Sequence, residues 1–576
     1  MSNSPRFYLW LALAMLLWWN YTTWTTEFAT APAAGHTASE RLAQRAPSSL
    51  ANRVPSESAP TPAQTTPTTP TTPPGQPPRL APPAPPAASI PSAPAAPSAA
   101  ATLIRVRTDV YDIEISARGG TLEKVALLKY ARVKGKAPRV VLENDASAER
   151  AYLLETGLTG PAGEPHPTHT ALYRAAQRSY RLDGSGTLRV PLTWSSGGIT
   201  VTKTFIFHKG SYRIELEYTV ENHSAAPWQA AAYAQIFRYD PRTKTSYFNP
   251  ASYAYHGPAI WNGEKYVQLD PASSDYKHFE QRVTSGWIAT PQHDFVSVFV
   301  PPRGSPYRFS SEVSGPEYLL SALGPEHTVA PGATVTLRQT LFAGPQLHAQ
   351  LEKIDPNLKY IVGYGWFTVL AGPLFWLLSK VHGVTGNWGV AIIVVTVLLK
   401  LLFYPLSEAS GRSMAKMKAL GPRIKNLQET YKDDKEKLGR AMMEIYKREK
   451  VNPVAGCLPM VIQIPFFFAF YRILLDSAEM RQAPFILWIH DLSARDPYFI
   501  LPAIMAVASF VQYKLNPAPP DPVQAKMMMI MPIGMSVMFA FFPAGLVLYW
   551  VTNTLLSIAQ QWNINRRIAA ATARKT

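Results

Sequence analysis

A single charged residue interrupts a long apolar run in the last third of the chain. Lys400 is the only charged residue between Trp388 and Leu406. An ionisable side chain at the centre of a bilayer costs about 2.5–3.5 kcal/mol on insertion scales, so such residues usually have a function and face protein or water. Thr396 and Tyr404 lie four residues to either side, and residues at that spacing share one face of a helix. The pattern predicts a polar stripe that faces a hydrated cavity.

Snorkelling is the alternative for this lysine. Lys400 lies about six residues, roughly 9 Å of helix, from the end of its apolar run, so its ammonium could reach the membrane surface instead. Polar residues on the other apolar segments favour the cavity, because Tyr549, Asn553 and Ser557 recur at spacing four. The predicted substrate groove comprises Lys400, Thr396, Gln463, Ser509, Gln512, Tyr549, Trp550 and Asn553.

Methionines form a second group of candidate residues. Methionine adapts to many apolar shapes, which suits a surface that accepts varied hydrophobic segments. Ordinary lipid-facing filler is the alternative, and the sequence leaves it open. The predicted contacts to substrate or partner are Met414, Met417, Met442, Met527 and Met531.

Catalytic and metal-binding patterns are missing from the sequence. The apolar segments contain no paired carboxylates, catalytic triad or phosphate loop, and the rest of the chain contains no HExxH or CxxC spacing. His166 and His169 lie in a Pro/Gly-rich loop, and such a pair rarely has a catalytic role. Cys457 is the only cysteine, so no intrachain disulfide can form. We therefore expect no enzyme, no cofactor and no metal site.

Composition separates the chain into a polar part and an apolar part. The 576 residues carry a formal charge of +17, and 47% are hydrophobic. This length exceeds what one core usually organises. The basic excess fits anionic lipid and membrane topology better than specific nucleic-acid binding, because several apolar segments could span a membrane.

The N-terminal part predicts an anchor followed by a tether. Arg6 precedes a largely apolar run that ends in interfacial aromatic residues, which favours an uncleaved transmembrane anchor over residues 1–26 with a cytoplasmic N-terminus. A cleaved signal peptide is the alternative. Residues 27–101 form a Pro/Ala/Thr-rich linker that cannot bury enough apolar surface to order itself, and we find no binding motif in it.

Residues 102–347 predict an all-β domain. The segments 109–116, 200–207, 212–220, 294–300 and 333–342 alternate apolar and polar residues or are β-rich, and the turn at 208–211 predicts a hairpin. Short strands with Gly/Pro punctuation favour an antiparallel sandwich. Residues 348–386 follow and predict an amphipathic helix, broken at Gly372-Pro373, that lies along the periplasmic surface of the membrane.

Residues 387–565 predict a five-span helical core. A cytoplasmic helical hairpin over 407–450 has 12 Lys and Arg against 7 Asp and Glu, which fits the positive-inside rule. Asp433 and Asp434 predict the start of its second helix. Further apolar runs cover 454–475, 498–515, 527–543 and 544–562, and residues 566–576 form a basic cytoplasmic tail.

Five segments of the chain resemble the YidC family of membrane protein insertases from Gram-negative bacteria, part of the wider Oxa/YidC/Alb family. They read GNWGVAIIVVTVLLKLLFYPL, SMAKMKALGPRI, EKVNPVAGCLPMVIQIPFF, RQAPFILWIHDLSARDPYFILP and FPAGLVLYWVTN. RGGTLEKVALLKY in the β region is also similar to the family. The resemblance extends over the whole architecture and implies a periplasmic domain of the supersandwich type.

The resemblance also implies a function and partners. A member of this family is an insertase without ATP hydrolysis, which places proteins in the inner membrane alone or with the Sec translocon, SecYEG and SecDF. Lys400 corresponds to the groove cation, which is commonly arginine, and the pair Tyr549-Trp550 stands where Tyr-Tyr is common. Newly made membrane proteins are the expected partners, with the ribosome, the signal recognition machinery and anionic lipids as further candidates.

Two other classes of protein share parts of this pattern. A secondary transporter would place a charge on a polar midplane face but would show internal repeats, and the sequence contains none that we detect. An anchored carbohydrate-active protein would need clustered carboxylates on the sandwich, and no such cluster stands out. The sequence therefore favours the insertase.

Overall fold

The computed structural model describes most of the chain after residue 102. The described residues are 50–56, 103–132, 134–136, 138–144, 151–184, 186–239, 255–271, 273, 276–364, 367–431, 434–449, 458–515 and 522–573. The described residues all belong to one compact unit, which begins at Leu50. The predicted N-terminal anchor, 1–26, and most of the linker lie outside the described residues.

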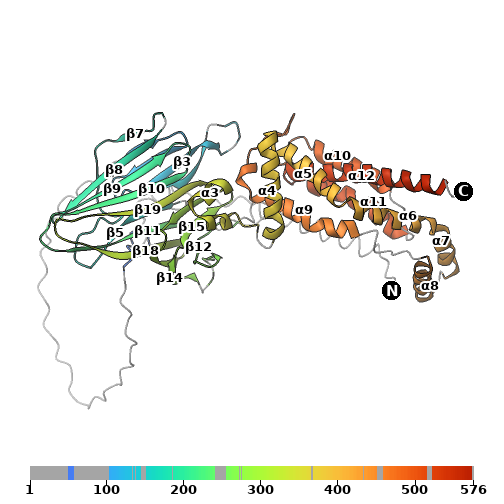
Figure 1. The fold of residues 1–576 in the computed structure, drawn as a ribbon, viewed down its shortest axis with the longest axis horizontal. Coiled ribbons are helices and arrows are strands. Elements are labelled where there is room, and N and C mark those ends of the chain that lie inside the picture. Colours follow the sequence, from blue (N-terminus) through green and yellow to red (C-terminus); the bar gives the residue numbers. More distant parts are fainter. Residues whose placement is uncertain are drawn as a thin grey trace, which may run out of the picture. The chain divides into compact units, whose positions relative to one another are not determined.

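The β region is a sandwich of two sheets, as predicted (Figure 1). Among the described residues, the first sheet has ten strands and the second nine. In spatial order the first contains β14 (Glu280–Thr284), β17 (Pro306–Ser314), β18 (Glu317–Val329), β11 (Trp228–Tyr239), β5 (Tyr152–Thr159), β4 (Arg139–Asn144), β3 (Leu122–Ala131), β2 (Tyr111–Ser116), β1 (Leu103–Arg107) and β7 (Ser179–Arg181). The second contains β13 (Tyr266–Gln268), β12 (Ala259–Trp261), β15 (Trp287–Gln292), β16 (Phe295–Val300), β19 (Thr334–Pro345), β10 (Arg213–Asn222), β9 (Ile199–His208), β8 (Thr187–Ser196) and β6 (Arg174–Ala175).

The hairpin of β9 and β10 shows how the sequence pattern determines the register. Burial alternates along β10, as expected for a strand with one face toward the core. Ile214 pairs with Phe207 across the antiparallel ladder, and both are buried. Gly210 in the connecting turn has a φ of 72°, a conformation that glycine adopts without steric cost. The predicted turn and strands are confirmed here. One exception to the antiparallel pattern is the pairing of β1 with β7, which is parallel.

The prediction that the whole linker stays unordered is wrong for a short segment. Residues 50–56 pack on the sandwich, and Leu50 is buried in a cluster with Phe237 and Leu319. Val54 packs against a second cluster that includes Tyr233. Leu50 and Val54 are two large apolar side chains that can pay for local ordering, which the Pro/Ala/Thr composition of the linker as a whole conceals.

Helices form the rest of the described chain. They are α3 (His348–Ile354), the 3₁₀ helix η4 (Pro356–Ile361), α4 (Thr368–Thr385), α5 (Trp388–Leu402), α6 (Tyr404–Ala419), α7 (Gly421–Thr430), α8 (Lys435–Arg448), α9 (Leu458–Asp476), the 3₁₀ helix η7 (Ala478–Met480), α10 (Ile500–Leu515), α11 (Pro522–Phe539) and α12 (Ala544–Ala573). None of the described helices is by itself both long enough and apolar enough to cross a bilayer. The bent pair 388–402 and 404–413 together has sufficient length and hydropathy.

One predicted helix end and one predicted helix break are wrong. The helix that carries Lys400 ends at Leu402 instead of Leu406, and α6 departs at 58°. Pro405 explains the break, because it has no N–H to donate to the carbonyl of the residue four positions earlier. The predicted break at Gly372-Pro373 is absent, since α4 continues through Pro373. There the proline removes one backbone hydrogen bond near the start of the helix, and the helix tolerates this loss.

The last helix is longer than the apolar run predicted. The helix α12 continues past residue 562 through Arg566 and Arg567 to Ala573. Arginine has a high helix propensity, so a change from apolar to basic side chains does not itself end a helix. Arg566 and Arg567, which the sequence assigned to a separate tail, therefore belong to α12, whereas Arg574 and Lys575 lie outside the described residues.

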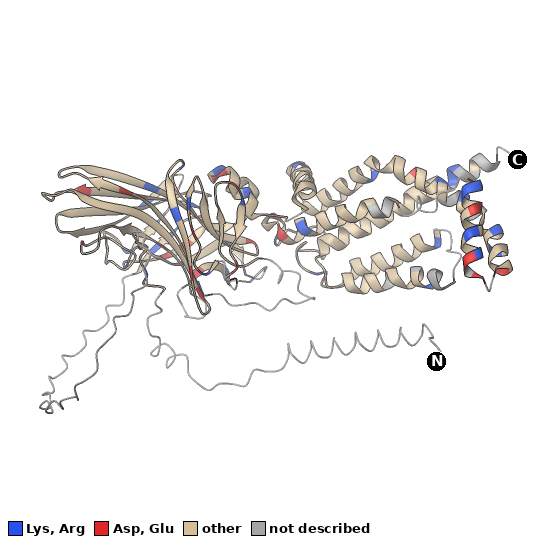
Figure 2. Ribbon diagram, turned by 90° about the horizontal axis from the view of Figure 1, so that it is seen from below, with Lys and Arg blue, Asp and Glu red and all other residues tan. Residues whose placement is uncertain are grey.

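The predicted hairpin over 407–450 begins in the C-terminal part of α6 and continues through α7 and α8. Asp434 caps α8, because its carboxylate accepts a hydrogen bond from the backbone N–H of Lys437 at 3.0 Å. The helices α7 and α8 share a small apolar cluster in which Leu420, Ile424 and Tyr446 are buried. Charged residues gather on this hairpin, whereas α9 and α10 are almost free of them (Figure 2). The hairpin is a polar element that needs only a minimal core of its own.

Candidate functional site

The residues around Lys400 line a pocket between four helices. A cavity of about 40 Å³ lies among α5, α6, α9 and α12, with room for a few water molecules. Leucine, isoleucine and phenylalanine side chains form its apolar wall. Its polar lining consists of Thr396, Lys400, Ser407, Gln463, Tyr549 and Asn553.

The ammonium group of Lys400 lies toward α12. Its Nζ donates a hydrogen bond to the hydroxyl of Ser557 at 2.7 Å, and that hydroxyl donates to the carbonyl of Asn553 at 2.8 Å. Gln560 donates to the backbone carbonyl of Lys400 at 3.3 Å. None of the carboxylates in the described part of the chain forms an ion pair with Lys400. An ammonium has three N–H donors, so this contact leaves donors free for water or a ligand.

The other polar groups of the pocket are held by their own helices or by each other. Thr396 is buried, and its hydroxyl donates to the carbonyl of Ile392 at 2.6 Å. The side-chain amide of Gln463 on α9 donates to the amide oxygen of Asn553 on α12. The ring of Tyr549 stacks on Phe470 with centroids 4.4 Å apart. These contacts fix the polar wall, while the Lys400 ammonium is the only cation among the described residues that line the pocket.

Three of the eight predicted groove residues do not line this pocket. Ser509 is buried in α10, and Gln512 is half-buried one turn later. Trp550 packs in an aromatic cluster, with Phe467 at 5.1 Å and Phe539 at 5.2 Å between centroids. The ring of Trp550 thus packs among aromatic side chains, whereas its neighbour Tyr549 lines the pocket.

The structure also adds residues that the prediction did not select. Ser557 contacts Lys400 directly, and its spacing of four from Asn553 was a signal that the sequence contained. Ser407 lines the pocket because the chain bends between α5 and α6. The sequence predicted an unbroken helix here, so it gave no reason to include Ser407. Tyr404 also differs from the prediction, because it does not line the pocket. Its hydroxyl instead accepts a hydrogen bond from the side-chain amide of Asn563 at 3.5 Å.

The predicted methionine contacts lie in two different environments. Met417 and Met442 pack against the apolar cluster of the hairpin. Met527 and Met531 on α11 are exposed, with 68% and 52% of their surface accessible. The side chain of Met414 lies outside the described residues. The hairpin methionines therefore have a packing role, whereas those of α11 remain available for contact.

Among the described residues, the histidines of the sandwich loop do not belong to a cluster of metal-ligating side chains. Across the described residues, no group of three or more His, Cys, Asp or Glu could hold a metal ion. His169 is buried, and burial lowers the pKa of its imidazole to about 4. A neutral imidazole at this position is a hydrogen-bonding group of the sandwich.

Comparisons with known proteins assign both halves of the chain. Residues 103–377 match the family described as YidC periplasmic domain, and residues 380–571 match the family described as 60Kd inner membrane protein. A membrane protein insertase YidC of Cupriavidus necator is 48% identical over 472 residues, which cover 81% of this chain and 83% of the relative. The chain belongs to the YidC family of membrane protein insertases.

Other relatives carry the same name. The YidC insertase of Methylobacillus flagellatus is 45% identical over 83% of this chain and 86% of its own length. A crystal structure of an active YidC insertase with its first transmembrane domain resolved is 18% identical, with 80% of this chain and 93% of that chain covered and a TM-score of 0.37. The predicted family is confirmed by the sequence comparisons, and the relatives are named as insertases and not as catalysts. The chain is thus a membrane protein insertase with a periplasmic domain.

Proposed function

We propose that the pocket around Lys400 receives the polar or acidic segment of a membrane protein during insertion. The observation that carries the proposal is the half-buried ammonium of Lys400, which has a serine hydroxyl as its partner and no carboxylate among the described residues. A hydrated, positively charged groove of this kind needs no ATP, because entry of the substrate's apolar helix into lipid supplies the driving force.

The physical argument concerns the distance that a polar segment must cross. The hydrocarbon core is about 30 Å thick, and an unsatisfied polar group within it costs several kcal/mol. A pocket with water and hydrogen-bonding side chains shortens the dry part of that path. Two unit charges 4 Å apart attract by about 4 kcal/mol at an effective dielectric constant of 20, against about 1 kcal/mol in bulk water. Lys400 thus offers an acidic segment a temporary partner at a step where water is scarce.

We further propose the membrane arrangement predicted from the sequence. It comprises an N-terminal anchor, five core spans, a periplasmic supersandwich and cytoplasmic N- and C-termini in the inner membrane of a Gram-negative bacterium. The excess of base in 407–450 supports a cytoplasmic hairpin. A thiol reagent that cannot cross the membrane should label Arg189→Cys from the periplasm and should label Lys416→Cys only after the membrane is opened. Periplasmic labelling of Lys416→Cys would overturn this arrangement.

The hairpin is proposed as the receiving surface for nascent chains or their carriers. Exposed charge on α7 and α8 supports this, since polar, basic surfaces attract acidic partners such as the ribosome. SecYEG, SecDF and anionic lipids are the other partners proposed for the chain. Replacing residues 413–448 with a Gly/Ser linker should abolish insertion while the helical core stays folded. Unchanged insertion by that variant would leave the hairpin a role in topology alone.

The decisive experiment varies the charge at Lys400 and in the substrate. One small substrate is made with an acidic and with a neutral translocated tail, and its insertion is measured in cells that depend on the variant. Lys400→Arg should insert both substrates. Lys400→Ala should impair the acidic tail most, and Lys400→Glu should impair it further, because like charges repel.

The control separates the role of Lys400 from any general effect of losing a lysine. Lys380 is exposed on α4, lies outside the hairpin and does not line the pocket, so Lys380→Ala should insert both substrates normally. Snorkelling predicts a modest loss of stability in the Lys400 variants that does not depend on the tail. Equal defects for both tails, or none, would remove Lys400 from the mechanism without affecting the family assignment.

A further inference from the structure

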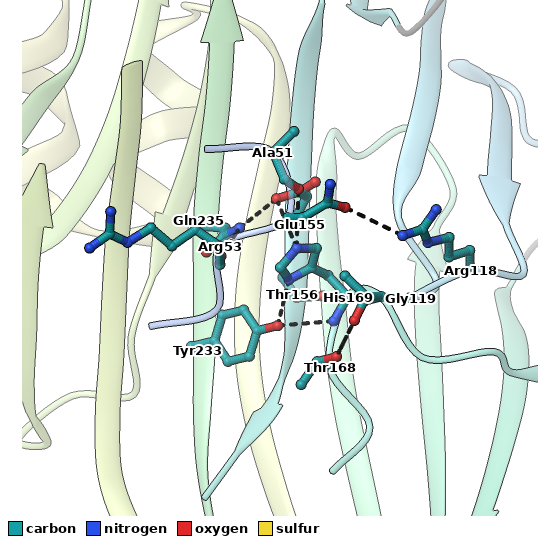
Figure 3. A network of polar contacts seen from close by, with 12 residues as sticks. Ala51, Arg53, Arg118, Gly119, Glu155, Thr156, Thr168, His169, Tyr233 and Gln235 are labelled. Atoms are coloured by element: carbon teal, nitrogen blue, oxygen red, sulfur yellow. Dashed lines mark hydrogen bonds and ion pairs between the residues drawn. The ribbon is translucent and has the colours of Figure 1, made fainter. Parts of the chain in front are cut away.

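The outer face of the first sheet is covered by a segment of the linker. Residues 50–56, called the strap below, pack on side chains of β5, β11 and β18 that lie outside the main core between the two sheets. Figure 3 shows Ala51 and Arg53 of the strap beside Glu155, His169 and Gln235. Leu50 packs with Phe237 and Leu319, and Val54 with Tyr233 and neighbouring residues. The strap therefore places two apolar side chains, four residues apart, in two separate apolar clusters.

Polar side chains buried under the strap contact its backbone. The side-chain amide of Gln235 donates to the carbonyl of Arg53 at 3.1 Å and to the carboxylate of Glu155 at 2.6 Å. His169 contacts the carbonyl of Ala51 at 3.3 Å through Nε2. These groups converge on the strap from two strands and a loop of the sandwich (Figure 3).

The tautomer of His169 follows from its contacts. The backbone N–H of His169 donates to the hydroxyl of Tyr233 at 2.9 Å, and that hydroxyl lies 2.7 Å from Nδ1 of the same histidine. The hydroxyl proton of Tyr233 therefore points to Nδ1, so the ring proton is on Nε2 and is donated to Ala51. His169 therefore binds a backbone carbonyl, a group that any extended peptide has whatever its sequence.

Other side chains of the sandwich contact side chains of the strap, so these contacts depend on the sequence of the strap. Arg53 forms an ion pair with Glu312 at 2.7 Å, and Arg118 donates to the side-chain oxygen of Asn52 at 3.3 Å. Arg308 donates to the carbonyl of Ser56. The strap is thus held through apolar, amide and cationic side chains in the order Leu-x-Asn-Arg-Val.

Burial of polar groups distinguishes this face from an ordinary covered sheet. Glu155, His169 and Gln235 have at most 4% of their surface exposed, although an apolar face would pack against a cover at lower cost. The amide oxygen of Gln235 is buried without a hydrogen-bond partner in the described structure. An unused acceptor at this buried position suits a site that binds peptide backbone, because the N–H of a differently seated segment would satisfy it.

We propose that this face is a binding site for an extended peptide of the pattern Leu-x-Asn-Arg-Val, and that the strap occupies it as a ligand within the same chain. A tethered segment acts at an effective concentration of about millimolar, so even weak contacts keep the site filled. An extended segment of another polypeptide with the same pattern binds when the strap leaves. This site is separate from the Lys400 pocket, and the proposal does not depend on the mechanism of insertion.

Trypsin tests whether the strap is docked. In the purified full-length protein, cleavage after Arg53 should be slow relative to cleavage after Arg79, which serves as an internal reference in the same linker. Leu50→Asp removes one buried anchor, and a buried leucine contributes about 1.5–3 kcal/mol, so cleavage after Arg53 should accelerate by about tenfold or more. Ser48→Asp is the matched control, because it introduces the same charge two residues earlier and should leave the rate unchanged.

A peptide tests whether the site binds ligands in trans. A fluorescent peptide with the sequence of residues 50–56 should bind saturably to full-length Leu50→Asp and much more weakly to the parent protein. Glu312→Arg, added to Leu50→Asp, should weaken binding of this peptide, and a peptide with Glu in place of Arg53 should restore it. Equal cleavage after Arg53 in the parent and in Leu50→Asp would overturn the docking. Failure of the peptide to bind Leu50→Asp would overturn the peptide site and leave the strap a fixed part of the sandwich.

Discussion

Replacing Glu143 with glutamine should remove a pH dependence from the stability of the sandwich. Glu143 lies on β4, is fully buried, and accepts a hydrogen bond from the hydroxyl of Ser297 on β16 at 2.5 Å. Its second carboxylate oxygen has no partner among the described residues. Burial raises the pKa of this carboxyl from 4.5 to about 7, since the charged form loses its hydration.

The sign and size of the effect follow from this shift. Because the folded state holds the proton more tightly than the unfolded state, stability is full below pH 4.5 and is lost as the pH rises through 7. The shift corresponds to about 3 kcal/mol, at 1.36 kcal/mol per pKa unit. Glu143→Gln keeps an acceptor for Ser297 and cannot ionise, so the free energy of unfolding should not fall over this range. The variant should exceed the parent in stability at pH 8 by up to about 3 kcal/mol.

A buried thiol can report unfolding of the sandwich in the full-length protein. In a Cys457→Ser background, Ala289→Cys introduces a thiol at a fully buried position of β15. Urea titrations at pH 5 and pH 8, each followed by a pulse of thiol reagent long enough to label every exposed thiol, give the midpoint of unfolding. The parent should have a lower midpoint at pH 8 than at pH 5, and Glu143→Gln should have similar midpoints at both.

Glu143→Ala is the contrasting variant in this experiment. It removes the ionisable group but also leaves a cavity and an unpaired Ser297 hydroxyl, so it should lose stability at both pH values. An equal fall in midpoint from pH 5 to pH 8 in the parent and in Glu143→Gln would refute the reasoning, because another group would then account for the pH dependence.

Two further predictions concern the helical region. A Cβ added at Gly389 would lie 2.1 Å from the ring of Phe485, so Gly389→Ala should lower stability in detergent by about 1–3 kcal/mol, and a thermal melt should show recovery when Phe485→Ala is added. Asp434→Ala removes the acceptor for the Lys437 N–H, so amides in the first turn of α8 should exchange hydrogen faster, whereas Asp434→Asn should protect them. Unchanged stability for Gly389→Ala, or unchanged exchange for Asp434→Ala, would contradict the respective prediction.

Local patterns in the sequence predicted the sandwich well. Strands such as β9 and β10 have period-two alternation and a glycine turn between them, and both signals are local. The order of strands within each sheet was not predictable, because it depends on pairings between distant segments. Thus β11 lies between β18 and β5, which are separated from it by long stretches of chain. No single window of sequence contains that information.

The candidate site was predicted in part for a related reason. A spacing of four identified Thr396 and Lys400 on one helix and Tyr549 and Asn553 on another, and the structure brings these together. The spacing could not show which face of α10 points inward, so Ser509 was included although it lies elsewhere. Polar residues identify the faces of helices that avoid lipid, whereas packing between helices decides which of those faces meet.

The bend between α5 and α6 connects the two proposed roles of the core. Pro405 cannot donate a backbone hydrogen bond to the preceding turn, and the chain turns by 58° directly after the helix that holds Lys400. The same bend brings Ser407 to the pocket, and α6 then leads through Leu420 into the apolar cluster of the hairpin. One proline therefore determines the shape of the pocket and the direction in which the hairpin leaves the core. Any movement of the hairpin on binding a partner would act on the pocket through α6, the helix that they share.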